Sequence, residues 1–224
     1  NTINYYDNEQ QVVDEVMKSR KGVCMHYATL MSWICNRAGV KTFVVGGYTR
    51  QNGKVDILSH AWNVSFVNGK WQIIDPTWGT GQIVNGKFVR QLNNEFFLMQ
   101  PEEGIKSHCP FDPMWQLLQY PIDNNNFSKG IVAIDKRKPL FSFNDSIAAY
   151  EKADELTRQK AALRRMENNG INSKLLQENQ HQIKNRINSI QKNTSIETFN
   201  NAVNTLNQAV NDLNEFINYR NKQF

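Results

Sequence analysis

The chain has 224 residues, a formal net charge of +5 and 40% hydrophobic residues. That length allows one large domain or two small ones, and a unit of about 115 residues can bury a core of its own. The positive charge is spread along the chain instead of forming a basic stripe, so the sequence predicts no nucleic-acid binding. No apolar run approaches the roughly 18 residues of a membrane-spanning helix, so no membrane span is expected.

The three cysteines are too few for a disulfide framework, and their odd number directs attention to a reactive thiol. Cys24 and Cys35 lie about 16 Å apart along one predicted helix, which is too far for a disulfide bond. The pairs Cys24/His26 and His108/Cys109 lack the two-residue spacing of structural zinc sites. The sequence therefore predicts no metal and no cofactor.

The N-terminal part of the chain predicts two helices. Asp7 to Gln10 is typical of a helix cap, and the apolar residues from Val12 to Met17 then indicate a short amphipathic helix. A second helix begins at Cys24 and ends before Gly39, which is well placed as its C-terminal cap. Apolar residues surround most of this second helix, so we expect it to be buried.

Strand signals follow at once. Lys41 to Tyr48 is rich in β-branched and aromatic residues, which predicts a strand. Asn-Gly between alternating apolar residues is the strongest short-range hairpin signal, because both residues tolerate positive φ. The chain contains three such pairs, at Asn52-Gly53, Asn68-Gly69 and Asn85-Gly86. Three successive hairpins predict an antiparallel sheet, and helices followed by such a sheet indicate the α+β class.

The pattern changes after Pro121. A strand signal at 130–134 is followed by apolar residues at helical spacing without a catalytic motif. Three helices are expected there, with apolar residues over 147–166, 183–190 and 196–217. The predicted division is a core over 1–122, a linker with short strands over 123–145 and a three-helix appendage over 146–224.

The second hairpin brings two polar side chains together. Its turn pairs residues whose numbers sum to 137, which places Trp62 opposite Asp75. Side chains alternate between the two faces of a sheet, so His60 becomes a diagonal neighbour of Asp75, about 7 Å away and within reach of a hydrogen bond. This face also carries most of the large apolar residues, so we expect it to pack on the Cys24 helix.

Three motifs, Gly22-Val23-Cys24, His60-Ala61-Trp62 and Asp75-Pro76-Thr77, follow one another in this order. Over roughly residues 8–122 they resemble the transglutaminase-like superfamily of papain-type cysteine enzymes. The resemblance implies a papain/transglutaminase-like core in which the Cys-bearing helix packs on the sheet. Met25 stands where animal transglutaminases usually carry tryptophan, and no calcium-site signature is present. These departures favour the bacterial transglutaminase-like group.

The three motifs predict a catalytic triad. A helix N-terminus and a neighbouring imidazolium lower a thiol pKa, so Cys24 is the expected nucleophile and His60 its base. Asp75 is expected to orient His60, with His108 as the candidate base if His60 fails. Cys35 is expected to be a core residue. Trp62, Trp78 and Tyr27 are candidates for the substrate cleft, although aromatic residues on a sheet face are more often core.

The expected function is hydrolysis of peptide or amide bonds in a peptide or protein substrate through a thioester intermediate. Two alternatives stay open: transamidation of protein glutamine residues, and a non-catalytic binding module on the same fold. The C-terminal helices are candidates for binding a protein partner. The sequence does not fix the location of the protein, although an extracytoplasmic place in a bacterium is favoured.

Overall fold

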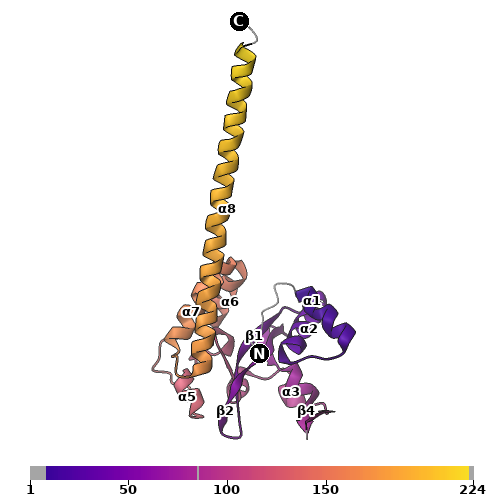
Figure 1. Ribbon diagram of the computed structural model, residues 1–224. Coiled ribbons are helices and arrows are strands. Elements are labelled where there is room, and N and C mark those ends of the chain that lie inside the picture. The colour runs from indigo at the N-terminus through magenta and orange to yellow at the C-terminus, as the bar shows by residue number, and fades with distance from the viewer. Residues whose placement is uncertain (1–8, 85, 222–224) are drawn as a thin grey trace.

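The computed structural model of the chain describes residues 9–84 and 86–221. Helices and an antiparallel sheet are combined in one α+β fold, as the sequence predicted (Figure 1). The strands are β1 (Thr42–Gln51), β2 (Lys54–Val67), β3 (Lys70–Ile74), β4 (Gly81–Val84), β5 (Lys87–Arg90) and β6 (His108–Pro110). The α-helices are α1 (Glu9–Ser19), α2 (Cys24–Arg37), α3 (Pro76–Thr80), α4 (Pro101–Gly104), α5 (Asn124–Ser128), α6 (Phe143–Lys152), α7 (Glu155–Asn168) and α8 (Lys174–Asn221). Two 3-10 turns are η1 (Asn94–Phe96) and η2 (Pro113–Gln116).

The main sheet has four strands in the order β3-β2-β1-β6, and each neighbouring pair is antiparallel. The predicted hairpins at Asn52-Gly53 and Asn68-Gly69 are formed, with positive φ at all four turn residues. Val64 pairs with Ile73, which confirms the predicted register of β2 and β3. The third hairpin pairs β4 with β5 as a separate sheet. Its Asn85, like the cap residues before Glu9, lies outside the described residues.

The helix α2 packs on the face of the sheet that carries small and polar side chains. Ala28 of α2 and Ala61 of β2 are both fully buried at this contact. Asn63 lies beside them, and its Nδ2 donates to the carbonyl oxygen of Ala28 at 2.9 Å. Small side chains let the helix come close to the strands, and the Asn63 amide then holds it in place.

The opposite face carries the large apolar side chains and is covered by the C-terminal part of the chain. Trp62 and Val64 of this face form one buried cluster with residues from η2 and α6, among them Met114, Trp115 and Ile147. The prediction that this face packs on the Cys24 helix is therefore wrong. Its many large side chains indicated burial correctly but gave no information about which element covers them.

The C-terminal helices differ from the prediction in their division. The helix expected over 147–166 is interrupted, because α6 ends at Lys152 and Asp154 caps the start of α7 by accepting from the Thr157 amide at 2.7 Å. The second and third expected helices are one continuous helix, α8. Within the described residues, 130–134 have no regular secondary structure, so the short strand predicted there is wrong. The segment 123–145 contains α5 instead.

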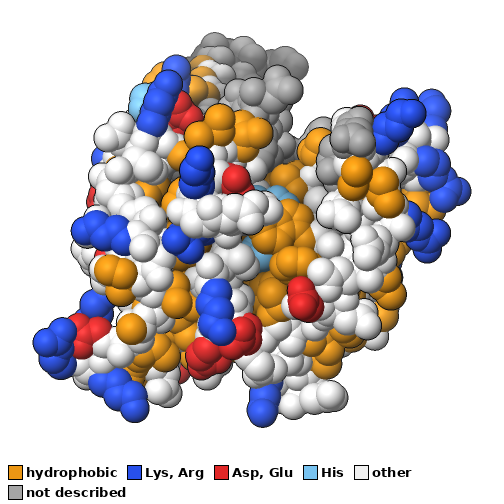
Figure 2. Space-filling model, turned by 90° about the horizontal axis from the view of Figure 1, so that it is seen from below, with side chains coloured by type: hydrophobic (Ala, Val, Ile, Leu, Met, Phe, Trp, Pro, Cys, Tyr) orange, Lys and Arg blue, Asp and Glu red, His pale blue; other side chains and the backbone are white. Residues whose placement is uncertain are grey.

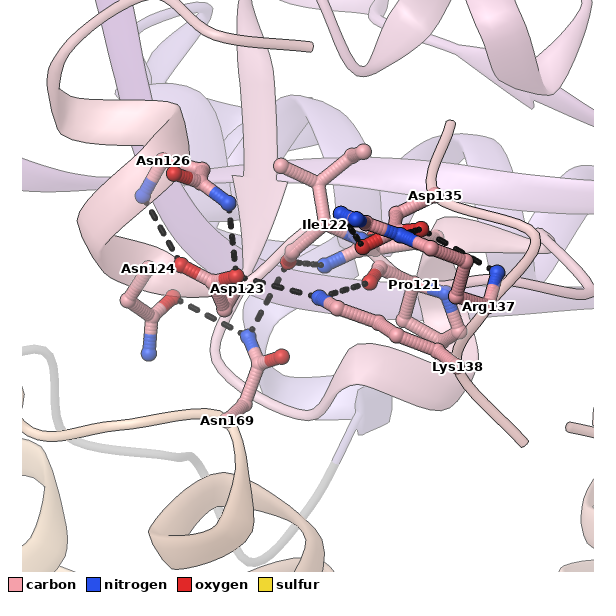
Figure 3. Close-up of polar contacts among 10 residues, drawn as sticks. Pro121, Ile122, Asp123, Asn124, Asn126, Asp135, Arg137, Lys138 and Asn169 are labelled. Carbon is pink, nitrogen blue, oxygen red and sulfur yellow. Dashed lines mark hydrogen bonds and ion pairs between the residues drawn. The ribbon is translucent and has the colours of Figure 1, made fainter. Parts of the chain in front are cut away.

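The segment after Pro121 is held by the polar contacts shown in Figure 3. Lys138 Nζ lies 3.0 Å from Asp123 Oδ2 and 3.4 Å from the carbonyl oxygen of Pro121. Asn169, which follows α7, donates to the carbonyl oxygen of Ile122 and to Asn124 Oδ1, both at 3.3 Å. These contacts connect the segment to the end of α7.

The helices α7 and α8 also share buried surface with the rest of the fold. Met166 of α7 and Leu176 of α8 are fully buried in a cluster that includes Tyr48 of β1. Arg165 forms two hydrogen bonds with the Asp112 carboxylate, at 2.7 and 2.8 Å. The division into core, linker and appendage stays a prediction. Within residues 9–84 and 86–221, no helix combines the length and the apolar composition needed to cross a bilayer.

Candidate active site

Cys24 is the first residue of α2, and the residues around it define the helix start. The Val23 amide donates to His26 Nδ1 at 3.1 Å, which satisfies an amide at the helix N-terminus. Gly22 permits this close turn, because a Cβ there would lie 2.8 Å from the Cβ of His26. The Cys24 sulfur contacts the His60 side chain and the backbone amides of Met25 and Ala61. The structure thus brings the predicted nucleophile and base together at the end of the helix.

Asp75 lies behind His60, as predicted. His60 Nε2 is 2.7 Å from Asp75 Oδ2, and the carboxylate is fully buried. The other oxygen, Oδ1, accepts from the backbone amides of Thr77 at 2.8 Å and Trp78 at 3.1 Å. Asp75 is therefore also the N-cap of α3, and this second role fixes the direction of its side chain. Since Nε2 of His60 faces Asp75, Nδ1 is the nitrogen left for the Cys24 thiol.

A second histidine, His108, shares the same carboxylate. Pairing of β6 with β1 places it opposite Thr49, and its Nε2 lies 3.0 Å from Asp75 Oδ2. The Ser107 Oγ lies 2.8 Å from its Nδ1. The sequence indicates His108 only as an alternative base to His60 and does not predict this contact. The available signal was a histidine within an apolar stretch, because a buried histidine requires hydrogen-bond partners.

The site favours a charge-separated state of the predicted triad. Burial raises the pKa of Cys24, but the hydrogen bond and the charge of His60 outweigh it and lower that pKa overall. Burial lowers the pKa of His60, but its hydrogen bonds with Asp75 and Cys24 raise it to about 9. Burial raises the pKa of Asp75, but the hydrogen bonds from His108 and His60 hold it well below its usual range. A thiolate next to an imidazolium is the reactive form of such a pair.

His108 is the uncharged member of the group. Burial holds the pKa of His108 below its usual value, although Asp75 acts in the opposite direction. The neutral ring can then donate from Nε2 to Asp75 and accept at Nδ1 from the Ser107 hydroxyl. Asp75 therefore receives four hydrogen bonds, two at each oxygen.

The three cleft candidates lie in different surroundings. Trp62 is fully buried beneath the histidines, 5.0 Å from the His108 ring between centroids, so its assignment to the cleft is wrong. Trp78 is partly exposed and stacks on His60 at 5.3 Å. Tyr27 is partly buried on α2 and is not among the residues that line the two hollows described next.

The strand segment Ile57–His60 lines two hollows. The larger has a volume of about 640 Å³ and lies between this segment, Met25 and the first turns of α8. The smaller, of about 290 Å³, includes Trp78 and Asp56. Figure 2 shows a hollow in the surface with histidine and hydrophobic side chains at its base. His60 is thus accessible from a cleft with one wall formed by α8.

The other two cysteines have different surroundings from Cys24. Burial raises the pKa of the Cys109 thiol to about 12, and this side chain is fully buried. Cys35 is partly buried on α2, three helical turns from Cys24. Cys24 therefore differs from both in having a histidine partner.

His60, Asp75 and His108 also offer donor atoms that lie within 4.8 Å of one another, a spacing that could hold a metal ion. In the described structure these atoms are hydrogen-bonded directly to one another, with the carboxylate oxygen between the two ring nitrogens. The expectation of no metal stays a prediction that a chelation experiment can test.

Comparison with known proteins agrees with the resemblance in the sequence. The profile of the transglutaminase-like superfamily matches residues 1–76, a range that includes Cys24, His60 and Asp75. Residues 1–76 are therefore similar to the transglutaminase-like superfamily. The expected superfamily relationship is therefore confirmed, and it covers the helix–sheet unit that brings the three side chains together.

Curated relatives share about half of this chain. Kyphoscoliosis peptidase of Homo sapiens is 33% identical over 128 residues, which cover 51% of this chain and 19% of that protein. Hillarin of Drosophila melanogaster is 27% identical over 120 residues, which cover 45% of this chain and 15% of that protein. Lim and transglutaminase domain protein ltd-1 of Caenorhabditis elegans is 26% identical over 121 residues, which cover 46% of this chain and 17% of that protein. The chain therefore spans less than a fifth of the length of these relatives, and its bacterial assignment stays a prediction.

Proposed function

We propose that this transglutaminase-like chain is a cysteine-dependent acyl-transfer enzyme that hydrolyses peptide or amide bonds. The observation that carries the proposal is the continuous contact from the Cys24 sulfur through His60 to Asp75. The lowered pKa of Cys24 and the raised pKa of His60 support a thiolate–imidazolium pair near neutral pH. The name of the human relative, a peptidase, agrees with this chemistry.

The proposed reaction has two halves. The Cys24 thiolate attacks the carbonyl carbon of the substrate, and the new C–S bond places negative charge on the carbonyl oxygen. His60 then gives its proton to the leaving amine as the C–N bond breaks, leaving a thioester. In the second half, His60 takes a proton from water, and the hydroxide oxygen attacks the thioester carbon. The C–S bond breaks, the carboxylic acid leaves and the thiolate–imidazolium pair is restored.

The start of α2 supplies a donor for the developing oxyanion. The Cys24 amide is the first of the helix, and the first amides of a helix have no intrahelical acceptor. We assign this amide to the carbonyl oxygen of the tetrahedral intermediate. The positive end of the helix dipole acts in the same direction.

Access of water favours hydrolysis over transamidation. His60 lines two hollows of about 640 and 290 Å³, so water can reach a thioester formed beside it. Transamidation requires a site that holds an amine and excludes water. Transamidation is the second candidate because it uses the same three residues, and a non-catalytic binding module on this fold is the third.

Two experiments separate the three candidates. Limiting iodoacetamide at mildly acidic pH, followed by mass spectrometry, should modify Cys24 before Cys35 and Cys109, and the His60→Ala variant should lose this preference. Equal labelling of the three thiols would favour the binding module. An activated ester of a blocked glutamine should then give free acid with or without added primary amine. An amide as the main product would make the chain a transglutaminase.

A further inference from the structure

The helix α8 has two parts with different surroundings. In its first part Leu176, Asn179 and Ile187 are buried against the body of the molecule. From residue 191 to residue 212 every side chain is exposed. Figure 1 shows this second part as a single rod that projects away from the other helices and strands. The helix continues through both parts without interruption.

The projecting part carries an apolar stripe. Five large hydrophobic side chains are between 37% and 68% exposed there, at Ile196, Phe199, Val203, Leu206 and Val210. Their spacing alternates between three and four residues, which is the heptad pattern of a coiled coil. The sequence continues the same spacing with Leu213 and Ile217. The repeat thus covers three heptads, a length of about 33 Å at 1.5 Å per residue.

This stripe is distinct from the face that packs on the body. Extending the buried face of α8 beyond Ile187 and Ile190 leads to Thr194 and Glu197, which are polar. Counting about 100° per residue, the apolar stripe lies on roughly the opposite side of the helix from Leu176. The second part of α8 therefore presents its own apolar surface in a direction away from the fold's core.

We propose that this stripe pairs with the same stripe of a second copy in a parallel two-stranded coiled coil. The first core position of each heptad is β-branched, and the fourth carries a larger side chain. The residues are Ile196, Val203 and Val210 at the first position, and Phe199 and Leu206 at the fourth. β-branched residues at the first position with leucine at the fourth favour two parallel strands.

The charge pattern is compatible with an identical helix as the partner. The positions that flank the stripe meet across a parallel pair and usually carry charges that select a partner. Here they are uncharged, with Asn200 and Asn207 on one side and Ala202 and Ala209 on the other. Two identical helices can therefore pair in parallel without repulsion, while a charged partner helix would find no complementary charge. Pairing also supplies the packing that an exposed helix of this length requires for stability.

The pairing would place two candidate active sites at the same end of the dimer. The first turns of α8, from Lys174 to Gln182, form one wall of the larger hollow beside His60. In a parallel pair both of these walls lie at the same end of the coiled coil. The proposed dimer does not depend on the proposed catalysis. It is tested by the molecular mass of the protein in solution and not by enzymatic activity.

The test is sedimentation equilibrium of the full chain at micromolar concentrations. We expect twice the chain mass of 25.9 kDa. Val203→Glu/Leu206→Glu should give a monomer, because it places charges in the stripe. Asn201→Glu/Asn204→Glu adds the same charge on the outer side of the helix and should stay dimeric. A monomeric wild-type chain, or a dimer that withstands the Val203→Glu/Leu206→Glu change, would overturn the proposal.

Orientation is tested by disulfide crosslinking. Ile196→Cys, in a Cys24→Ser/Cys35→Ser background, should form a crosslinked dimer on mild oxidation, because a parallel pair places this residue beside its equivalent. In an antiparallel pair the two sulfurs would lie about 30 Å apart. Asn201→Cys in the same background is the control, and it should crosslink much less. A dimer without the Ile196→Cys crosslink would refute the parallel arrangement.

Discussion

Replacing Asp75 with asparagine tests the proposed triad most directly, because it removes a charge while keeping the size of the side chain. Asp75 Oδ2 lies 2.7 Å from His60 Nε2, and the pKa of His60 is about 9 against an ordinary 6.5. This difference corresponds to about 3 kcal/mol in favour of the imidazolium, to which Cys24 also contributes. Without the carboxylate we expect the pKa of His60 to fall toward its ordinary value.

The pH dependence of the activity follows from the protonation states of Cys24 and His60. The active thiolate–imidazolium pair requires a pH above the pKa of Cys24 and below that of His60. Wild-type activity should therefore fall as the pH rises through about 9. In Asp75→Asn the fall should begin at a lower pH, and kcat/KM at about pH 8 should drop by up to roughly 30-fold, because the imidazolium fraction of His60 falls by that factor.

The assay is hydrolysis of a p-nitrophenyl ester of a blocked amino acid, followed from about pH 5 to about pH 10. Asp135→Asn is the matched control, since it removes the same charge at a partly exposed position beside Arg137. Thermal unfolding must be compared as well, because Asp75 caps α3. If the folded Asp75→Asn variant keeps its alkaline limit near pH 9, then Asp75 does not hold the charge of His60 and the proposed triad is wrong.

Further predictions concern the surroundings of the site. His108→Asn should lower kcat about 10-fold with little change in KM, because a charge-assisted hydrogen bond to Asp75 is lost; an unchanged kcat would contradict this role. Gly47→Ala should destabilise the fold to urea by roughly 3 kcal/mol, because the new Cβ would lie 2.3 Å from a carbonyl oxygen of β6. Gly79→Ala, with its nearest atom at 3.6 Å, should be nearly neutral, and equal effects would refute the packing argument. A chain ending at Thr194, which lacks only the proposed dimer contact, should lose less Tm than one ending at residue 145, which should lose about 10 °C or more because it uncovers the cluster around Met166 and Leu176. Dialysis against EDTA should leave ester hydrolysis unchanged, and a loss restored by zinc would indicate an ion between the two histidines.

The contact between His60 and Asp75 could be predicted because its geometry is local. A two-residue Asn68-Gly69 turn sets the register of β2 and β3, and strand alternation then selects the face. The start of α2 at Cys24 was predictable for the same reason, since the signals lie within a few residues. Both inferences depend on neighbours in the sequence.

The contact between His108 and Asp75 is different, because it depends on a long-range strand pairing. The strand β6 has three residues and pairs with β1 across more than fifty residues of intervening chain. No turn signal connects the two strands, so their register could not be predicted. The same limit explains why the predicted packing face for α2 was wrong. The size of the apolar residues indicates that a sheet face is buried, but long-range packing decides which element covers it.

The undivided helix α8 shows how an apolar pattern can change without a change in secondary structure. The sequence predicted a break near residue 190, because the apolar positions before and after it fall on different stripes. A helix ends where capping residues, glycine or proline interrupt its hydrogen bonds, and residues 174–221 contain neither glycine nor proline. The shift of the stripe therefore marks a change of partner along one continuous helix. The first stripe meets the body of the same chain through Leu176 and Ile187, and the second, from Ile196 to Val210, requires a surface outside it. This change of partner is the physical basis for expecting a second copy at the projecting end of α8.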